Sequence, residues 1–153
     1  MRFRVIARDR VKNRLCFAGF TFAFLLSASL NGANENAIVS RTATVDGVKL
    51  SYLTAGHGPT VILVHGYTQT SRMWKPIIPL LAKKFTVIAP DLPGIGDSEI
   101  PASGLDMKTS ATRIHALAKS LGVEKASVVG HDIGLMVAYA YAANSRLKPR
   151  NLF

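Results

Sequence analysis

The sequence is poor in cysteine, because Cys16 is the one cysteine among 153 residues and cannot form an internal disulfide. This cysteine and the four histidines form no CxxC or HxxxH pattern, which excludes the common zinc modules. Internal repeats and low-complexity tracts are absent as well. What remains is a chain with 48% hydrophobic residues, long enough for about one domain or for part of a larger one, and able to form a packed core.

Acidic residues are also few: 9 Asp and Glu against 19 Lys and Arg give a net charge of +10. Half of this excess lies in residues 1–30, which contain six basic residues and one acidic residue. After Arg41, basic residues stand singly or, at Lys83 and Lys84, as a pair, and they are not interleaved with aromatic residues along one helix face. This distribution argues against nucleic acid as a partner.

The first thirty residues have the order of an export signal, with a basic stretch, an apolar run over 15–30 and then small polar residues. The apolar core, 16–28, is shorter than the roughly 20 residues of a membrane-spanning helix, which favours a signal peptide cleaved after Ala28 or Ser29. An uncleaved signal anchor is the alternative. Both interpretations predict an exported protein, periplasmic or secreted, that meets the membrane only through this leader.

Residues 31–37 are interpreted as a polar linker, and residues 38–153 as the N-terminal part of an α/β domain. A hairpin is expected where strands 38–44 and 48–54 flank Asp46-Gly47, a dipeptide typical of type I′ turns. Continuous apolar runs predict buried parallel strands, and helical spacing predicts helices between them. The expected strands are 60–65, 85–89 and 125–130, and the expected helices are 71–84, 106–121 and 133–143.

This order of elements predicts a three-layer α/β sandwich with a mostly parallel sheet and an N-terminal hairpin. Asp106 is the expected N-cap of the second helix, and Gly122 is its expected stop. In such folds, functional loops gather at the carboxyl ends of the parallel strands.

One of these loops, Gly130-His131-Asp132-Ile133-Gly134, joins a β-branched strand to an Ala-rich helix. A turn this tight strains its central residue, and glycines two positions before and after it let neighbouring backbone approach. Asp132 is thereby exposed as a nucleophile supported by His131 and the glycines, with the Ile133 N–H at a helix N-terminus that favours negative charge. A carboxylate can attack a saturated carbon and displace an epoxide oxygen or a halide. A simple N-cap role for Asp132 is the alternative.

A second loop, His65-Gly66-Tyr67, follows the predicted strand 60–65. Nucleophile turns of this kind take a second oxyanion donor from such a loop, and here it would be the backbone N–H of Tyr67. His65 and Gly66 are interpreted as structural, because a catalytic base would follow the nucleophile in chain order. The third loop, 91–98, has no Lys-Ser/Thr pair at phosphate-loop spacing and is interpreted as a rigid turn whose Asp91 and Asp97 bind loop amides.

Three motifs carry a family resemblance: DGVKLSYLTAGHGPTVILVHGYTQTSRMW, FTVIAPDLPGIGDSE and VVGHDIG. Their order and spacing resemble those of α/β-hydrolases of the epoxide hydrolase type, over residues 44–153, and the exported form is similar to the Cif-type secreted epoxide hydrolases. The resemblance implies that Asp132 is the nucleophile, that Tyr67 and Ile133 supply the oxyanion amides, and that an epoxide is hydrolysed to a diol through an alkyl ester. We expect no cofactor and no metal.

Two neighbouring families share the nucleophilic aspartate and define the alternative activity. Haloalkane dehalogenases usually place Trp after it and fluoroacetate dehalogenases usually place Arg, to hold the departing halide, whereas this chain has Ile133. Dehalogenation is therefore the second candidate among enzymes. The expected partner in either case is a small molecule, an epoxide or a halide.

The partners of the nucleophile are expected downstream of it, where the resembling enzymes carry an acid, a histidine and a helical cap with the proton donor. Residues 133–153 contain no Asp, Glu or His. We therefore expect a chain truncated after the elbow helix and without turnover, because an alkyl ester, if it formed, would not be hydrolysed. A non-catalytic exported fragment or binding module, and a membrane-anchored interaction protein, are the alternatives outside enzymes. The oligomeric state stays open.

Overall fold

The computed structural model describes residues 36–144. The chain divides into two units, Met1–Gly32 and Ala33–Phe153, and the described residues all belong to the second. The predicted leader, most of the predicted linker, and residues 145–153 lie outside the described residues. Within the described range, no helix combines the length and the apolar character that crossing a membrane requires.

Five strands form one mixed sheet in the order β1-β2-β4-β3-β5. Strands β4, β3 and β5 run parallel to one another, and β2 joins β4 antiparallel. The predicted parallel sheet with an N-terminal hairpin is thus confirmed. The strands are β1 (Val39–Val45), β2 (Val48–Ala55), β3 (Thr60–Val64), β4 (Thr86–Pro90) and β5 (Ala126–Gly130).

Local turn chemistry sets the hairpin. β1 and β2 pair antiparallel around Asp46 and Gly47, whose φ angles of 49° and 74° are both positive, as a type I′ turn requires. Asp tolerates the left-handed region and Gly adopts it freely, so this dipeptide fixes the register of the first two strands.

Two longer helices form where the sequence predicts them, α2 (Met107–Ser120) and α3 (Ile133–Asn144). The side chain of Asp106 caps α2 by accepting a hydrogen bond from the Thr109 N–H at 2.9 Å. Gly122, with φ of 74°, follows the end of that helix in the left-handed conformation. Both signals predicted for this helix are therefore confirmed.

The helix predicted over 71–84 is wrong as a single element. The structure has a 3-10 helix, η1 (Ser71–Trp74), and a one-turn α-helix, α1 (Ile78–Leu81). Proline lacks an N–H and clashes with the preceding turn, so it is tolerated only near a helix start. Pro76 lies between the two pieces and Pro79 lies in the first turn of α1, so an uninterrupted helix is not possible here.

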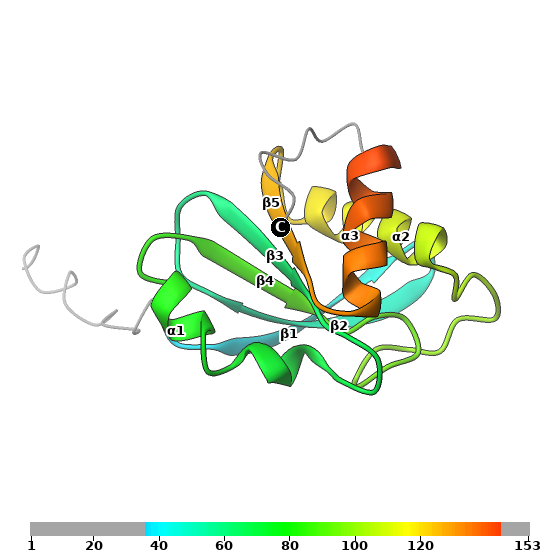
Figure 1. Cartoon of the computed structure of the whole chain (residues 1–153), viewed down its shortest axis with the longest axis horizontal. Helices are drawn as coiled ribbons and strands as arrows, with labels where there is room; N and C mark the ends of the chain where they lie inside the picture. The colour runs from blue at the N-terminus through cyan, green and yellow to red at the C-terminus, as the bar shows by residue number, and fades with distance from the viewer. Residues whose placement is uncertain (1–35, 145–153) are drawn as a thin grey trace, which may run out of the picture. The chain divides into compact units, whose positions relative to one another are not determined.

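Helices cover both faces of the sheet, with α2 and α3 on one face and α1 on the other (Figure 1). Buried side chains of the sheet accordingly form two clusters. One includes Ile62, Val64 and Val128 with residues of α2 and α3, and the other includes Leu63 and Val87 with residues at α1. Because β3, β4 and β5 are parallel, the loops that follow them meet at the same edge of the sheet, and the predicted site residues lie there.

Candidate active site

Asp132 occupies a strained turn between β5 and α3. Its φ of 52° lies in the left-handed region, which non-glycine residues seldom adopt. A Cβ on Gly130 would overlap the Gly134 carbonyl, and one on Gly134 would overlap the carbonyl oxygens of Val64 and His65. Residues without side chains are thus required at both ends of the turn, which holds Asp132 exposed at the edge of the sheet.

Gly66, in the loop after β3, lies close against this turn. A Cβ at residue 66 would lie 2.7 Å from Oε1 of Gln69, 2.8 Å from Nδ1 of His131 and 3.0 Å from Cβ of Asp132. A side chain here would displace the Gln69 amide, the ring of His131 or Asp132 itself. The exposed ring of His131 therefore lies beside Gly66, where it borders the turn.

The backbone of Tyr67 binds the carboxylate of Asp132. The Tyr67 N–H donates to Oδ2 of Asp132 at 3.0 Å, while the tyrosine side chain is exposed. Ile133 is the first residue of α3, so its N–H has no helical carbonyl to pair with. The two amides proposed from the sequence as oxyanion donors thus come from the residue after Gly66 and the residue after Asp132.

His65 is completely buried at the end of β3, and both of its ring nitrogens are hydrogen-bonded. Nδ1 lies 2.9 Å from the carbonyl oxygen of Gly66, and Nε2 accepts a hydrogen bond from the Leu92 N–H at 3.0 Å. A buried ring with both nitrogens occupied has none left to activate a water. The ring instead connects the loop after β3 to the loop after β4.

Gln69 was not predicted to have a role. Its side-chain Oε1 accepts a hydrogen bond from the Gly66 N–H at 3.2 Å, and its own N–H donates to the Gly66 carbonyl at 3.3 Å. These two bonds close the loop around Gly66. No sequence signal marks this contact, because glutamine at a loop position is most often a solvated side chain.

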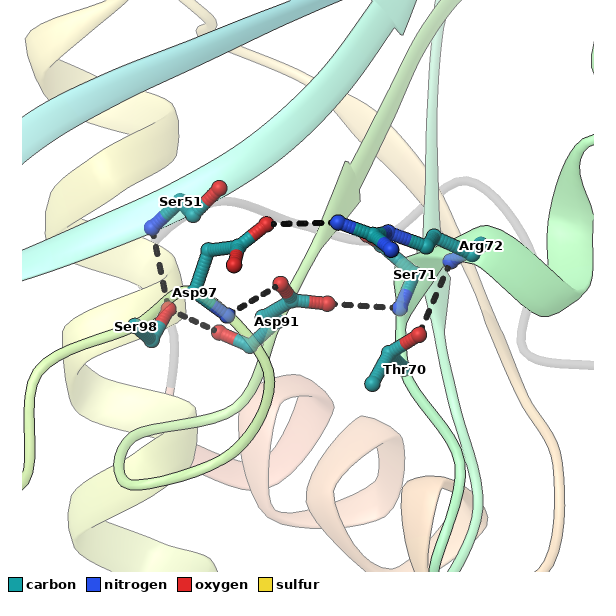
Figure 2. A network of polar contacts seen from close by, with 7 residues as sticks. All are labelled: Ser51, Thr70, Ser71, Arg72, Asp91, Asp97 and Ser98. Atoms are coloured by element: carbon teal, nitrogen blue, oxygen red, sulfur yellow. Dashed lines mark hydrogen bonds and ion pairs between the residues drawn. The ribbon is translucent and has the colours of Figure 1, made fainter.

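A buried carboxylate organises the neighbouring loops, as Figure 2 shows. Asp91 accepts hydrogen bonds from the N–H of Ser71 at 2.6 Å and from the N–H of Asp97 at 3.0 Å, which is the amide-binding role expected for it. The Asp97 carboxylate instead pairs with Arg72 at 3.1 Å. Ser98 completes the network by donating to the Asp91 carbonyl and accepting from the Ser51 N–H.

Other groups of the described residues lie apart from the turn at Asp132. Residues 36–144 contain no group of three His, Cys, Asp or Glu side chains that could hold a metal ion. A hollow of about 330 Å³ lies elsewhere, between the hairpin turn at 46–48 and the segment 99–103, and Asp132 does not line it. His115 lies within α2, with its ring against Tyr141 of α3.

Comparisons with known proteins agree with this geometry. A family model described as alpha/beta hydrolase fold matches residues 59–151. The soluble epoxide hydrolase of Corynebacterium sp. (strain C12) is 44% identical over 116 residues, which are 76% of this chain and 41% of that protein. The fluoroacetate dehalogenase of Burkholderia sp is 36% identical over 99 residues, 61% of this chain and 33% of that protein.

Among solved structures, the epoxide hydrolase CorEH without ligand superposes with a TM-score of 0.72 at 43% identity, covering 74% of this chain and 40% of that one. The chain therefore spans less than half the length of these relatives. The matched region contains both the loop after β3 and the turn at Asp132. The chain belongs to the α/β-hydrolase fold family, and within that family it is similar to epoxide hydrolases.

Proposed function

We propose that this chain carries the nucleophilic half of an epoxide hydrolase site and that Asp132 forms an alkyl ester with an epoxide. The observation that carries the proposal is the hydrogen bond from the Tyr67 N–H to Oδ2 of Asp132, made at a strained turn with φ of 52°. A structural N-cap would bind the N–H groups of its own helix, whereas this carboxylate binds an amide 65 residues away in sequence.

The proposed first step follows from which oxygen of the Asp132 carboxylate already accepts a hydrogen bond. Oδ2 accepts from Tyr67, so Oδ1 is the oxygen that attacks an epoxide carbon. A bond forms between Oδ1 and that carbon, the carbon–oxygen bond of the ring breaks, and the released alkoxide takes a proton from an acid or from water. In a later hydrolysis of the ester, negative charge would develop on Oδ2, where the amides of Tyr67 and Ile133 stabilise it.

Hydrolysis of the ester needs an activated water. The segment 133–153 supplies no Asp, Glu or His, and the ring of His65 is fully engaged in hydrogen bonds. We therefore propose that neither residues 133–153 nor His65 activates this water, so the alkyl ester is the species to look for.

The test is intact-mass spectrometry of the full chain after incubation with styrene oxide. We expect the addition of one epoxide, located at Asp132 by peptide mapping and removed by hydroxylamine, which cleaves esters but not alkylated Cys16 or histidine. Asp132→Asn should lose this adduct, while Asp97→Asn, an exposed carboxylate on a neighbouring loop, should keep it. An ester distributed equally over several carboxylates, or one that survives Asp132→Asn, would refute the proposal.

Dehalogenation is the second candidate, supported by the fluoroacetate dehalogenase relative. The side chain of Ile133 has no hydrogen-bond donor to hold a departing halide, which favours the epoxide. Incubation with chloroacetate distinguishes the two, because a dehalogenase site would release about one chloride per chain as the ester forms. We expect ester formation with styrene oxide and no chloride release above that of Asp132→Asn.

We also propose that residues 1–30 export the protein, from the basic and apolar order of that segment. N-terminal sequencing of the chain recovered from cells tests this. A new N-terminus after Ala28 or Ser29 supports a cleaved signal peptide, an intact N-terminus in the membrane fraction supports an anchor, and an intact chain in the cytoplasm contradicts both.

A further inference from the structure

His65 shares a peptide group with the proposed oxyanion donor. The carbonyl that lies 2.9 Å from Nδ1 of His65 is that of Gly66, and the N–H on the other side of the same planar peptide is that of Tyr67. That N–H donates to Oδ2 of Asp132 at 3.0 Å. The buried ring therefore holds one end of the peptide whose other end binds the nucleophile.

The hydrogen-bond partners of His65 determine the position of its proton. Leu92 presents an N–H, which can only donate, so Nε2 of the ring carries no hydrogen. The Gly66 carbonyl can only accept, so Nδ1 carries the hydrogen and donates it. The ring is thus a neutral imidazole in a single tautomer, enclosed with no exposed surface.

A hydrogen-bond chain results, running from the Leu92 N–H through the ring of His65 and the Gly66–Tyr67 peptide to Asp132. Each group in it accepts at one end and donates at the other, which polarises the next bond and strengthens it. The hydrogen bond from His65 to the Gly66 carbonyl also fixes the plane of the Gly66–Tyr67 peptide. The Gln69 N–H donates a second hydrogen bond to the same carbonyl at 3.3 Å.

We propose that His65 is a positioning residue that aims and strengthens the Tyr67 oxyanion donor through the Gly66 carbonyl. This inference rests on the proposed function, because it takes the Tyr67 N–H as the donor to the reacting carboxylate. It assigns His65 no contact with substrate and no proton transfer.

Two substitutions separate this role from simple structural support. Asparagine places an amide N–H near the position of Nδ1, so His65→Asn keeps a donor for Gly66 and leaves the Leu92 N–H unpaired. Glutamine reaches the position of Nε2, so His65→Gln keeps an acceptor for Leu92 and leaves Gly66 without its donor. Each variant loses one buried hydrogen bond, so the two should lose similar amounts of thermal stability.

The first measurement is the NMR spectrum of the full chain labelled with ¹⁵N. We expect His65 to show a protonated Nδ1 and an unprotonated Nε2, and the Tyr67 amide proton to resonate downfield because it binds a carboxylate. His65→Gln should move this amide proton upfield, towards its position in Asp132→Asn, and His65→Asn should leave it close to wild type. A protonated Nε2, or equal movement in both variants, would overturn the proposal.

The second measurement is the rate of ester formation at Asp132 with styrene oxide. We expect His65→Gln to slow it by roughly tenfold, because a loosened Tyr67 amide no longer fixes the orientation of the attacking Oδ1, and His65→Asn to stay within about threefold of wild type. Equal slowing in both would mean that His65 acts only on stability. If the wild-type chain forms no ester, the proposed function fails, and the tautomer and the Tyr67 amide still decide the role of His65.

Discussion

Oδ1 of Asp91 lies 2.6 Å from the backbone nitrogen of Ser71, so a buried carboxylate after β4 fixes the start of η1, on the loop that follows β3. The other carboxylate oxygen accepts from the Asp97 N–H at 3.0 Å. Both oxygens therefore act as acceptors for backbone amides, an arrangement that only a carboxylate satisfies. His65 connects the same two loops, the one after β3 and the one after β4. Asp91 joins them through its carboxylate oxygens, and His65 joins them through its ring nitrogens.

Replacing this carboxylate by an amide tests the arrangement. In Asp91→Asn the new NH₂ group would face a backbone N–H, leaving a buried donor unpaired at a cost of about 1–3 kcal/mol. The control is Asp97→Asn, which breaks an ion pair with Arg72 whose side chains are 67% and 62% exposed and which contributes about 0–1 kcal/mol. Urea unfolding measures both free energies, and equal losses would contradict the different roles assigned to the two aspartates.

The sequence predicted those features that depend on local chemistry. The Asp46-Gly47 turn, the Asp106 cap and Gly130 each act on residues a few positions away, so their effect could be derived from neighbours in the chain. The parallel strands were predictable for a similar reason, since burial on both faces requires continuous apolar runs.

Contacts between residues far apart in the sequence were not predictable from their neighbours in the chain. The bond between His65 and the Leu92 N–H joins residues 27 positions apart, and it exists only because β3 and β4 are neighbours in the sheet. Asp91 and Asp97 lie six residues apart in one loop, yet Asp91 is buried against backbone amides and Asp97 pairs with Arg72 at the surface. The prediction of one helix over 71–84 was wrong for a local reason. Proline is tolerated only in the first turn of a helix, and Pro79 lies beyond the first turn of a helix that starts at Ser71.

Gly134 is expected to tolerate no side chain. Alanine favours a helix over glycine by about 1 kcal/mol, so Gly134→Ala would stabilise α3 if the site had space. A Cβ there overlaps two backbone carbonyls of the β3 segment, which cannot rotate away, and we expect a net loss of about 3 kcal/mol.

The matched substitution for Gly134→Ala is Gly122→Ala. Gly122 has φ of 74°, and a Cβ on it would have no atom within 4 Å. Gly122→Ala should therefore lower the free energy of unfolding only by the strain of alanine in the left-handed region, about 1 kcal/mol. Thermal and urea unfolding of both variants check the difference. A stabilised Gly134→Ala would show that α3 does not pack against β3 as closely as described.

Thr68 is a second strained residue near the nucleophile, with φ of 56° at a β-branched side chain. Thr68→Gly should relieve this strain and raise the free energy of unfolding by roughly 0.5–1 kcal/mol, after the greater chain entropy of glycine is subtracted. Thr70→Gly is the control, because Thr70 has an ordinary φ of −134° and its side chain caps η1, so glycine there should lower the free energy of unfolding. Urea unfolding of the two variants should give changes of opposite sign.

His115 gives the fold a dependence on pH. Its ring packs edge to face against Tyr141, with centroids 5.6 Å apart, and burial together with the charge of Lys119 lowers the pKa of His115 below 6.5. The unfolded chain therefore takes up a proton near pH 6.5, and the folded chain takes it up only at a lower pH. Between these values the unfolded state holds more protons, so this contribution to stability is complete above about pH 6.5 and is lost as the pH falls through the folded pKa.

Two variants isolate this contribution. His115→Phe keeps a ring against Tyr141 and removes the proton, so the free energy of unfolding should fall less steeply between pH 7 and pH 5 than in the wild type. Burial is the larger cause of the lowered pKa of His115, and the charge of Lys119 is the smaller one. Lys119→Met removes only this charge, so the free energy of unfolding should fall with pH at a slope between those of wild type and His115→Phe. Urea unfolding at several pH values measures the three slopes. Parallel slopes for His115→Phe and wild type would mean that His115 titrates alike in both states, and a Lys119→Met slope as shallow as that of His115→Phe would make Coulombic repulsion, not burial, the main cause.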